Sequence, residues 1–411
     1  MDFGKLYSER THAMKASEIR ELLKLTEKPN IISFAGGLPN PTTFPVQEIE
    51  EATHRVLRDH SKSALQYSTT EGVTVLREAV ADHLRADGMR VHPDQVLITN
   101  GSQQGLDLLG RVFLDKGDTI IVANPTYLGA LQSFNYFGAK YASADSDGDG
   151  IIPDSVEEVI KRLKQQGIRP KFLYVVSTFA NPTGTSISLA RRKRLLELAH
   201  EHDLLIVEDD PYGKLRFDGD PIPSIHSLDK DEGRVVYLGT FSKILVPGFR
   251  LAWSVAPMDV TRKMVISKQS VDLCTAAFTQ YIAADLLAGG LIDKHLPQII
   301  SLYRGKRDIM LREMGKHFPK EGTRWTNSQG GLFTWAELPK HVNTIQMLEA
   351  AVKRDVAYVP GKSFYPDPKE GFNTMRLNFS HPTDEKIKVG VERLGQVMAE
   401  WVAKPAKAVP A

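Results

Sequence analysis

The stretch "GTFSKILVPGFRLAW", residues 239–253, places two cations and two hydroxyl groups between apolar segments. Lys243 follows Thr240 and Ser242, and Arg250 comes seven residues after the lysine. The apolar runs on both sides are typical of strands buried in a sheet. A lysine between such runs gains little as a surface ion-pair partner, so the stretch predicts a polar binding site at the end of a buried strand.

Short apolar runs alternate with helical patterns from about residue 95 to residue 255. This alternation predicts an α/β fold with a mostly parallel central sheet, whose binding groups lie at the carboxyl ends of the strands. The predicted strands are "QVLIT" (95–99), "TIIVA" (119–123), "FLYVV" (172–176), "LLIVED" (204–209), "VVYLG" (235–239) and "LAWSVA" (251–256).

Two segments between these runs have helical periodicity. The first, "SVEEVIKRLKQQG" (155–167), carries one apolar stripe, a capping-box spacing of Ser155 and Glu158, and Gly167 where the helix should end. The second, "SLARRKRLLELAHEHD" (188–203), has a basic face. We interpret that face as solvent-exposed rather than as a nucleic-acid-binding patch.

The composition is that of an ordinary soluble globular protein, with 42% hydrophobic and 25% charged residues among 411. A net charge of +2 favours neither nucleic acid nor a membrane surface as a partner. The lone cysteine, Cys274, excludes an internal disulfide, and its apolar neighbours favour a buried packing role. The N-terminus has no signal-like pattern, and no apolar run reaches the roughly 18 residues of a membrane span, so we expect a cytoplasmic protein.

The pattern changes after about residue 295, where a long helical segment precedes short strands around "GGLFTWAEL" and "NTMRLNFS". We interpret this region as a second, α+β domain, because the chain is too long for one small core. The predicted division is 1–44 as an N-terminal arm and part of the small domain, 45–295 as the large domain, 296–401 as the C-terminal small domain, and 402–411 as a disordered tail.

Polar residues follow several of the predicted strands. Ser102 and Gln103, in "ITNGSQQG", would begin a helix, where free backbone N–H groups attract an anion. Asn181 lies in the turn "NPTG", and Asp209 ends a buried strand three residues before Tyr212. Each feature alone is equally compatible with a helix cap or a tight turn, so it is their gathering at one sheet edge that predicts a site.

Taken in order along the chain, these blocks resemble the class I/II, fold-type I aminotransferases, which depend on pyridoxal 5'-phosphate (PLP). The resemblance is greatest to the branch that contains 2-aminoadipate, kynurenine and archaeal aromatic or multi-substrate aminotransferases. It implies a large PLP-binding domain with a mostly parallel sheet and a smaller α+β domain. The matching blocks are "ISFAGGLPNPTTFP", "LQYSTTEG", "TNGSQQGLDLLGRVFL", "NPTYLGALQ", "STFANPTG", "VEDDPY", "GTFSKILVPGFRLAW", "GGLFTW" and "NTMRLNFS".

The resemblance implies a role for each residue near the cofactor ring. Lys243 would hold the PLP aldehyde as a Schiff base and later move the substrate proton, with its pKa depressed by nearby cations. Asp209 would keep the pyridine nitrogen protonated, so that the ring accepts electrons. Tyr212 and Asn181 would hydrogen-bond the ring hydroxyl oxygen, and Tyr127 would stack on the ring.

The resemblance also implies how the cofactor phosphate is held. The groups that would bind it are Ser102, Gln103, Thr240, Ser242 and Arg250. Tyr67, in "LQYSTTEG", would reach the phosphate of a neighbouring subunit, which implies a homodimer.

The implied substrate groups come from three segments. Arg376 would bind the substrate α-carboxylate through two parallel hydrogen bonds, with Asn181 beside it. Arg20, on the N-terminal segment, would meet a distal acidic group. Gly37 would let backbone approach the substrate. Ala180 stands where many related sequences carry glutamine, so substrate preference can differ here.

The resulting expectation is a broad-specificity aminotransferase with ping-pong chemistry. Donors would be aromatic amino acids, 2-aminoadipate, leucine-type amino acids or glutamate, and the acceptor a 2-oxo acid such as 2-oxoglutarate. The main alternative is a PLP-dependent β-lyase of the same fold. A transcription regulator with an aminotransferase-like domain is disfavoured, because about 30 residues before "ISFAGGLP" are too few for a DNA-binding domain.

We interpret "DSDGDG" (145–150) as a polar turn, since Val156 stands where a calcium loop needs glutamate.

Overall fold

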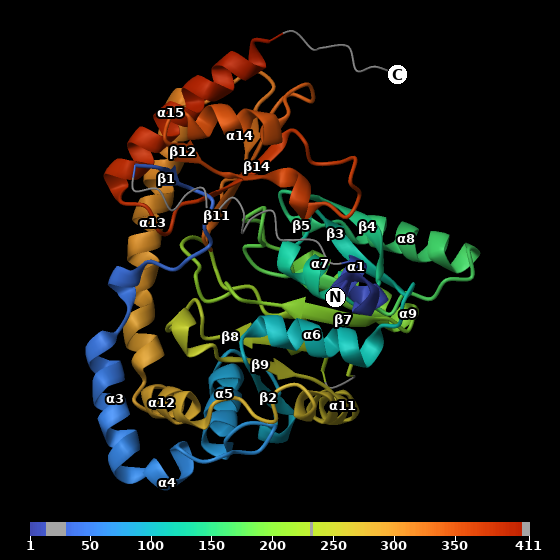
Figure 1. The fold of residues 1–411 in the computed structure, drawn as a ribbon, viewed down its shortest axis with the longest axis vertical. Coiled ribbons are helices and arrows are strands. Elements are labelled where there is room, and N and C mark those ends of the chain that lie inside the picture. The colour runs from blue at the N-terminus through green and yellow to red at the C-terminus, as the bar shows by residue number, and fades with distance from the viewer. Residues whose placement is uncertain (14–29, 231–232, 405–411) are drawn as a thin grey trace.

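The computed structural model describes residues 1–13, 30–230 and 233–404. An eight-stranded sheet in the order β2-β9-β8-β7-β6-β3-β4-β5 forms its centre (Figure 1). Strands β8, β7, β6, β3 and β4 pair in parallel, whereas β9 runs antiparallel to β8 and β2, and β5 to β4. The predicted mostly parallel sheet is confirmed. Its strands are β2 (Val96–Thr99), β3 (Thr119–Asn124), β4 (Lys140–Asp147), β5 (Gly150–Ile151), β6 (Phe172–Val176), β7 (Leu205–Asp209), β8 (Val235–Thr240) and β9 (Ala252–Val255).

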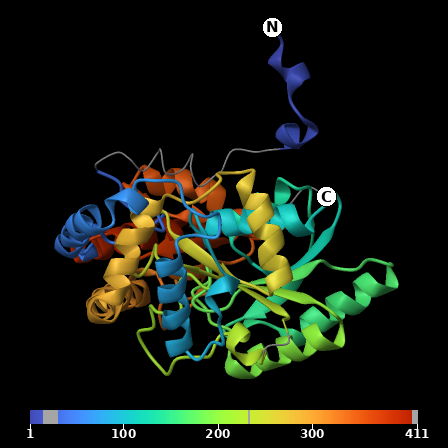
Figure 2. The same ribbon diagram turned by 90° about the horizontal axis from the view of Figure 1, so that it is seen from below.

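Helices cover both faces of the central sheet (Figure 2). Ile120 and Val122 of β3 pack into the cluster that includes α6 and α7, whereas Ile121 between them packs with α8 and α9. This alternation, the rule for a strand, buries both faces of the sheet. The helices of this part are α3 (Val46–Asp59), α4 (Ser61–Ala64), α5 (Thr74–Ala86), α6 (Ser102–Phe113), α7 (Leu128–Asn135), α8 (Pro153–Gln165), α9 (Leu189–Glu201), α10 (Ile225–Leu228), α11 (Met258–Gln269) and α12 (Ala277–Ala288).

A second, four-stranded antiparallel sheet in the order β10-β11-β14-β13 lies with the C-terminal helices (Figure 1). A separate pair of short strands, β1 and β12, joins the N-terminal segment to this part of the chain. The elements here are β1 (Ile32–Ser33), β10 (Arg324–Trp325), β11 (Phe333–Glu337), β12 (Val356–Ala357), β13 (Val359–Pro360), β14 (Thr374–Asn378), α13 (Leu291–His317), α14 (Thr344–Val352) and α15 (Asp384–Val402). Short elements elsewhere are α1 (Glu9–Ala13) and the 3-10 helices η1 (Phe3–Leu6), η2 (Pro41–Thr43), η3 (Pro93–Gln95), η4 (Pro247–Phe249) and η5 (Gly361–Phe364).

The long helix α13 runs along one side of the molecule, from α12 to α15 (Figure 1). Because it starts at Leu291, the predicted boundary between residues 295 and 296 falls inside its first turns. The division into domains stays a prediction. Of the predicted tail, residues 405–411 lie outside the described part of the chain.

The predicted capping box at Ser155 is wrong. Helix α8 begins two residues earlier, at Pro153, because proline favours the first helical position, where its missing N–H is not needed. The Ser155 hydroxyl instead accepts a hydrogen bond from the Asp145 backbone N–H, 2.9 Å away. Gly167, with φ of +69°, follows the C-cap Gln166 of the helix as predicted.

The basic face predicted for residues 188–203 is only partly exposed. Lys193 of α9 faces solvent, but Arg192 is fully buried. The prediction failed for Arg192 because a guanidinium is buried only where several acceptors meet it, and those acceptors come from segments distant in sequence.

Several smaller expectations concern single features. Cys274 is partly exposed rather than buried. Residues 145–150 form the end of β4 and its turn into β5, where Asp147 pairs with Gly150. Within residues 1–13, 30–230 and 233–404, no group of three or more His, Cys, Asp or Glu side chains could hold a metal ion. Over the same residues, no helix has both the length and the apolar character to cross a membrane.

A hydrogen bond from Asn40 to Tyr303 fastens the N-terminal segment to α13. The Tyr303 hydroxyl accepts from the buried Asn40 backbone N–H at 2.8 Å, and the Asn40 side chain donates to the Ser380 carbonyl at 3.2 Å.

We predict that Tyr303→Phe lowers the apparent free energy of unfolding by about 1–3 kcal/mol, because a buried N–H loses its acceptor. Urea titration measures this. Tyr281→Phe, whose ring stacks on His60, is the control, and an equal effect of both variants would contradict the assignment.

Candidate active site

The carboxyl ends of β6, β7 and β8 bring the predicted site residues together. The pairing aligns Val176 of β6 with Asp209 of β7, and Asp209 with Leu238 of β8. Asn181 therefore follows β6, and Lys243 follows β8, at the same edge of the sheet. This is where open parallel sheets hold their ligands.

Lys243 has unusual surroundings for a lysine. Its Nζ donates a hydrogen bond to the Gly37 carbonyl, 3.0 Å away, in the segment after β1. Burial lowers the pKa of Lys243 from 10.5 to about 8, and the charges of Arg376 and Arg250 act in the same direction. The sequence pointed to nearby cations as the cause, whereas burial is the larger one. With a pKa of about 8, about a tenth of this amine is the free base at pH 7, far more than for an ordinary lysine.

Asp209 is the last residue of β7 and is only 2% exposed. Its Oδ2 accepts a hydrogen bond from the Tyr174 hydroxyl at 2.8 Å, but its Oδ1 is buried without a partner. Burial raises the pKa of Asp209 to about 7, although the Tyr174 bond opposes this. An unpartnered carboxylate oxygen here calls for a donor, preferably a charged one.

Arg376 of β14 reaches this edge from the second sheet. Its Nη1 donates to Asn181 Oδ1 at 2.9 Å, and its Nη2 to the Ala35 carbonyl at 2.7 Å. The guanidinium carbon lies 4.3 Å from the centre of the Phe333 ring, and Nε has no partner. Burial lowers the pKa of Arg376 to about 10, so the group stays charged at neutral pH.

Two tyrosines complete the walls of the site. Tyr212 is 5% exposed and packs edge-on against Phe333, with its hydroxyl hydrogen-bonded to Asn181. Tyr127, at the N-cap of α7, lies so close over Gly129 that a Cβ there would collide with its ring. Burial and the Asp209 charge both raise the pKa of Tyr127, which therefore stays neutral.

The N-terminus of α6 forms a cradle at one end of the site. Its N-cap, Gly101, has φ of +76°, and a Cβ there would collide with the Arg250 guanidinium. The Ser102 hydroxyl, on the first residue of the helix, is buried without a partner. Unpaired helix N–H groups, a hydroxyl and a guanidinium together suit an anion.

Two predicted anion ligands have their side chains occupied. Gln103 Nε2 donates to the Gly129 carbonyl at 3.0 Å and to the Ser133 hydroxyl at 2.6 Å, so only its backbone N–H can serve the helix N-terminus. The Thr240 hydroxyl lies 3.1 Å from that of Ser242 and 3.3 Å from the Leu251 carbonyl, so it orients Ser242.

Of two further predicted residues, the structure describes only Tyr67, which does not lie in this cluster. Tyr67 is 79% exposed. Arg20 lies outside the described residues.

Tyr174 and Phe333 contact residues of the site, and the sequence predicted neither contact. Tyr174 lies within the apolar strand "FLYVV", and its bond to Asp209 depends on the β6–β7 register. The available signal was a tyrosine in a buried strand, since its hydroxyl needs a partner. Phe333 comes from the second sheet, and nothing in its local sequence predicts that contact.

The unpartnered atoms test whether the site fits PLP. Asp209 Oδ1 offers a carboxylate to a pyridine N–H, Ser102 Oγ and the α6 N-terminus suit a phosphate, and Arg376 Nε suits a carboxylate. Lys243 supplies a buried amine near Arg376 and Arg250. The donors and acceptors match the polar groups of the cofactor and of an amino acid substrate.

Comparison with known proteins places the chain. Residues 29–394 match the family model described as "Aminotransferase class I and II". The chain belongs to this family. The expected fold-type I architecture is confirmed, and the protein is a transaminase.

Similar proteins come from archaea and a thermophilic bacterium. Aromatic-amino-acid aminotransferase 1 from Thermococcus litoralis is 48% identical over 405 residues, or 98% of this chain and 96% of that protein. The solved multiple substrate aminotransferase from Thermococcus profundus has a TM-score of 0.93 at 48% identity, covering 97% of this chain and 99% of that one. LysN, an α-aminoadipate aminotransferase from Thermus thermophilus complexed with N-(5'-phosphopyridoxyl)-L-leucine, has a TM-score of 0.90 at 40% identity, covering 98% and 100%. The predicted branch of the class I and II aminotransferases is confirmed.

The depressed pKa of Lys243 has a measurable consequence for stability. Because the folded-state pKa lies near 8 and the usual value near 10.5, the unfolded chain binds more protons between these pH values, and the free energy of unfolding rises with pH there. We predict that Lys243→Met makes the cofactor-free aminotransferase more stable at pH 7, by about 1–2 kcal/mol.

This gain should shrink as pH rises towards 10, and urea titrations at several pH values measure it. Lys263→Met, at an exposed position of α11, is the control. If Lys243→Met were no more stable than the wild type at pH 7, burial of the charged Lys243 amine would not destabilise the folded protein, and the lowered pKa would be contradicted.

Proposed function

We propose that the protein is a broad-specificity aminotransferase that uses PLP. The donors are aromatic amino acids, 2-aminoadipate, leucine-type amino acids or glutamate, the acceptor is a 2-oxo acid such as 2-oxoglutarate, and the two half-reactions follow each other in a ping-pong sequence. The observation that carries this proposal is the buried amine of Lys243, whose pKa is lowered by burial and by the Arg376 and Arg250 charges, at the same sheet edge as the unpartnered Asp209 Oδ1. The names of the similar proteins support the aromatic, 2-aminoadipate and leucine-type donors.

PLP supplies an aldehyde that takes up an amino group and a ring that accepts the electrons left when the Cα proton departs. Asp209 would hold the ring nitrogen protonated through its free Oδ1, and that charged partner would in turn lower the carboxyl pKa from about 7. Asn181 and Tyr212, which already hydrogen-bond each other, bind the ring hydroxyl oxygen. Tyr127 would stack on the ring.

The α6 N-terminus holds the cofactor phosphate. Ser102 and Ser242 contribute hydroxyls, Gln103 its backbone N–H, and Arg250 a charged fork. Thr240 acts on the phosphate through Ser242, whose hydroxyl it orients.

Lys243 and Arg376 act on the substrate. Arg376 binds the α-carboxylate, with Nε available and Asn181 beside it. The free amine of Lys243 takes the proton from Cα, a task for which a pKa near neutrality is suited. Gly37 would bring backbone close to the substrate, and a Cβ added at this position would lie only 3.1 Å from the Phe333 ring.

Assembly and location follow as parts of the same proposal. We propose a homodimer in which Tyr67 reaches the neighbouring cofactor phosphate. Its 79% exposure suits a residue whose partner lies in another subunit. We propose that Arg20 meets a distal acidic group of the substrate, that the domains divide as the sequence indicates, and that the protein is cytoplasmic.

A PLP-dependent β-lyase of the same fold is the alternative. A lyase releases ammonia and a 2-oxo acid from one substrate, whereas a transaminase needs a second oxo acid. Product analysis with and without 2-oxoglutarate separates the two. Ammonia release without an acceptor would favour the lyase.

The central prediction concerns Lys243. Lys243→Ala should lose transamination and the visible absorption band of the bound cofactor, because no amine remains to hold the aldehyde. Borohydride reduction of the wild-type protein, followed by digestion and mass spectrometry, should place the pyridoxyl label on the peptide that contains residue 243. A label on another peptide, or full turnover by the variant, would refute the assignment.

The second prediction concerns Arg376. Arg376→Lys should raise KM for amino acids and oxo acids alike, by about ten-fold or more, since an ammonium cannot form two parallel bonds to a carboxylate. Steady-state kinetics with both substrate types measure this. Arg354→Lys, on the surface pair with Glu400, is the control. An unchanged KM for both substrate types would rule out the carboxylate role.

A further inference from the structure

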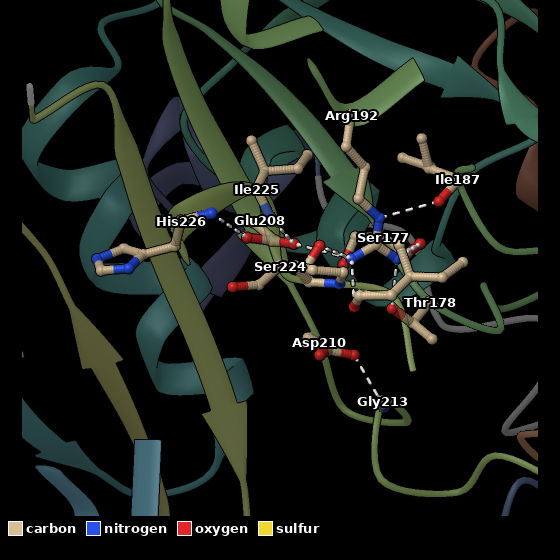
Figure 3. Close-up of polar contacts among 12 residues, drawn as sticks. Ser177, Thr178, Ile187, Arg192, Glu208, Asp210, Gly213, Ser224, Ile225 and His226 are labelled. Carbon is tan, nitrogen blue, oxygen red and sulfur yellow. Dashed lines mark hydrogen bonds and ion pairs between the residues drawn. The ribbon is translucent and has the colours of Figure 1, made fainter. Parts of the chain in front are cut away.

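Arg192 forms a buried junction with Ser177, Thr178 and Ile187 (Figure 3). Its side chain, on the first turn of α9, is 1% exposed. Its N–H groups meet acceptors from three separate loop ends. Nη2 donates to the Ser177 carbonyl and to the Thr178 hydroxyl, both at 2.8 Å, Nε to the Ile187 carbonyl at 2.9 Å, and Nη1 to the Pro223 carbonyl at 2.9 Å.

Three of these contacts belong to one loop. Ser177 and Thr178 begin the segment that carries Asn181, and Ile187 ends it. Arg192 therefore closes the loop at its base, while its tip reaches Arg376 through Asn181. Between base and tip, Phe179 holds φ of +47°, a conformation that costs a non-glycine residue about 1 kcal/mol or more. The loop needs such an anchor to stay in this conformation.

Glu208 balances the charge of Arg192 and fastens the next loop. The two side chains lie 3.9 Å apart, and Glu208 is also fully buried. Its two oxygens accept from the backbone N–H groups of Ile225 and His226, each at 2.9 Å, which caps α10 (Figure 3). This capped helix follows the loop that begins with Tyr212, so the junction holds the far ends of both loops.

Strand alternation explains why the junction lies directly behind the site. Glu208, Asp209 and Asp210 are consecutive, so Asp209 faces the site while its neighbours face Arg192 and α10. Asp210 Oδ1 accepts from the Gly213 backbone N–H at 2.9 Å and so shapes the turn that carries Tyr212.

A buried ion pair alone is weak evidence for a functional role, since apolar residues often stabilise as well. What distinguishes Arg192 is its set of partners. Its four shortest hydrogen bonds go to the ends of two loops, and these loops carry site residues. They do not join elements within one packed core. A guanidinium is suited to this because its donors are fixed in one plane, whereas a lysine has fewer donors and one centre.

We propose that Arg192 is a positioning residue that sets Asn181 against Tyr212 and Arg376, and thereby tunes how strongly the cofactor ring oxygen is hydrogen-bonded. This inference rests on the proposed function of Asn181 and Tyr212. Hydrogen-bond donors to the ring oxygen would stabilise the negative charge on that oxygen. They would therefore favour loss of the proton that the oxygen shares with the neighbouring nitrogen of the lysine–cofactor bond. Loosening the loop raises the pH midpoint at which the visible band of the bound cofactor changes.

The groups that face this hydrogen-bonded pair are left unchanged by the test. They are Arg376 on β14, Asp209 on β7, Tyr127 before α7 and Tyr174 on β6, with Lys243 and Arg250 beyond Arg376. A shift of the midpoint in a variant of Arg192 therefore reports the position of Asn181, not the loss of a charge in the site.

The test compares four variants of the cofactor-loaded protein. Arg192→Lys removes most of the junction, and Thr178→Val removes one bond of it. Arg191→Lys is the control for the first, because Arg191 pairs with Asp147 at the surface of the same helix. Thr261→Val is the control for the second, since this buried threonine on α11 bonds the Ala256 carbonyl. The readouts are the pH midpoint of the absorption band, KM for amino and oxo acids, and the melting temperature.

We expect Arg192→Lys to raise the midpoint by about one pH unit, and Thr178→Val to raise it by less, each with a higher KM for carboxylate substrates. The controls should leave both quantities unchanged. Where Arg192→Lys fails to fold, Thr178→Val decides. Midpoints equal to those of the controls, whatever the melting temperatures, would show that Arg192 serves stability alone. A wild-type protein without any cofactor band would instead overturn the proposed function.

Discussion

The parallel register of β6, β7 and β8 is the constraint on which the site depends. It aligns Val176, Asp209 and Leu238, so that three loops leave the sheet at one edge. A slip of one residue in β7 would turn Asp209 to the opposite face and present Glu208 in its place. The register is secured by burial of both faces of the sheet, since each strand packs alternate residues into different layers.

Burial at this edge favours the neutral forms of the ionisable groups in the site. The pKa of Asp209 rises to about 7 and that of Lys243 falls to about 8, for the same reason: a charged group loses solvation. The protein also leaves polar atoms of Asp209, Ser102 and Arg376 unpartnered. Such groups destabilise the protein until complementary groups meet them, so binding of the cofactor and stability of the fold are linked. On the opposite face of the sheet, Arg192 hydrogen-bonds both ends of the loop that carries Asn181.

The sequence predicted six of the eight strands of the central sheet, because short apolar runs are a local signal, but it missed the largely polar β4 and the short β5. It also predicted the spacing of Asp209 and Tyr212, and of Ser242 and Lys243, since these residues lie close together along the chain. It failed for Ser155, where a proline two residues earlier began the helix. It failed for Gln103 and Arg192 for another reason. Their side chains bond α7 and the loops after β6 and β7, and no local pattern reports such partners.

The sequence by itself determined the fold class, the order of the elements and the chemical types at the strand ends, because hydrophobic period and residue chemistry are properties of short segments. Only the tertiary structure decided which atoms lack partners, that burial outweighs nearby cations in lowering the pKa of Lys243, and that Arg192 faces inward. Solvation and hydrogen bonding at a given atom depend on which distant segments pack against it, and for Arg376 those segments are far from it along the chain.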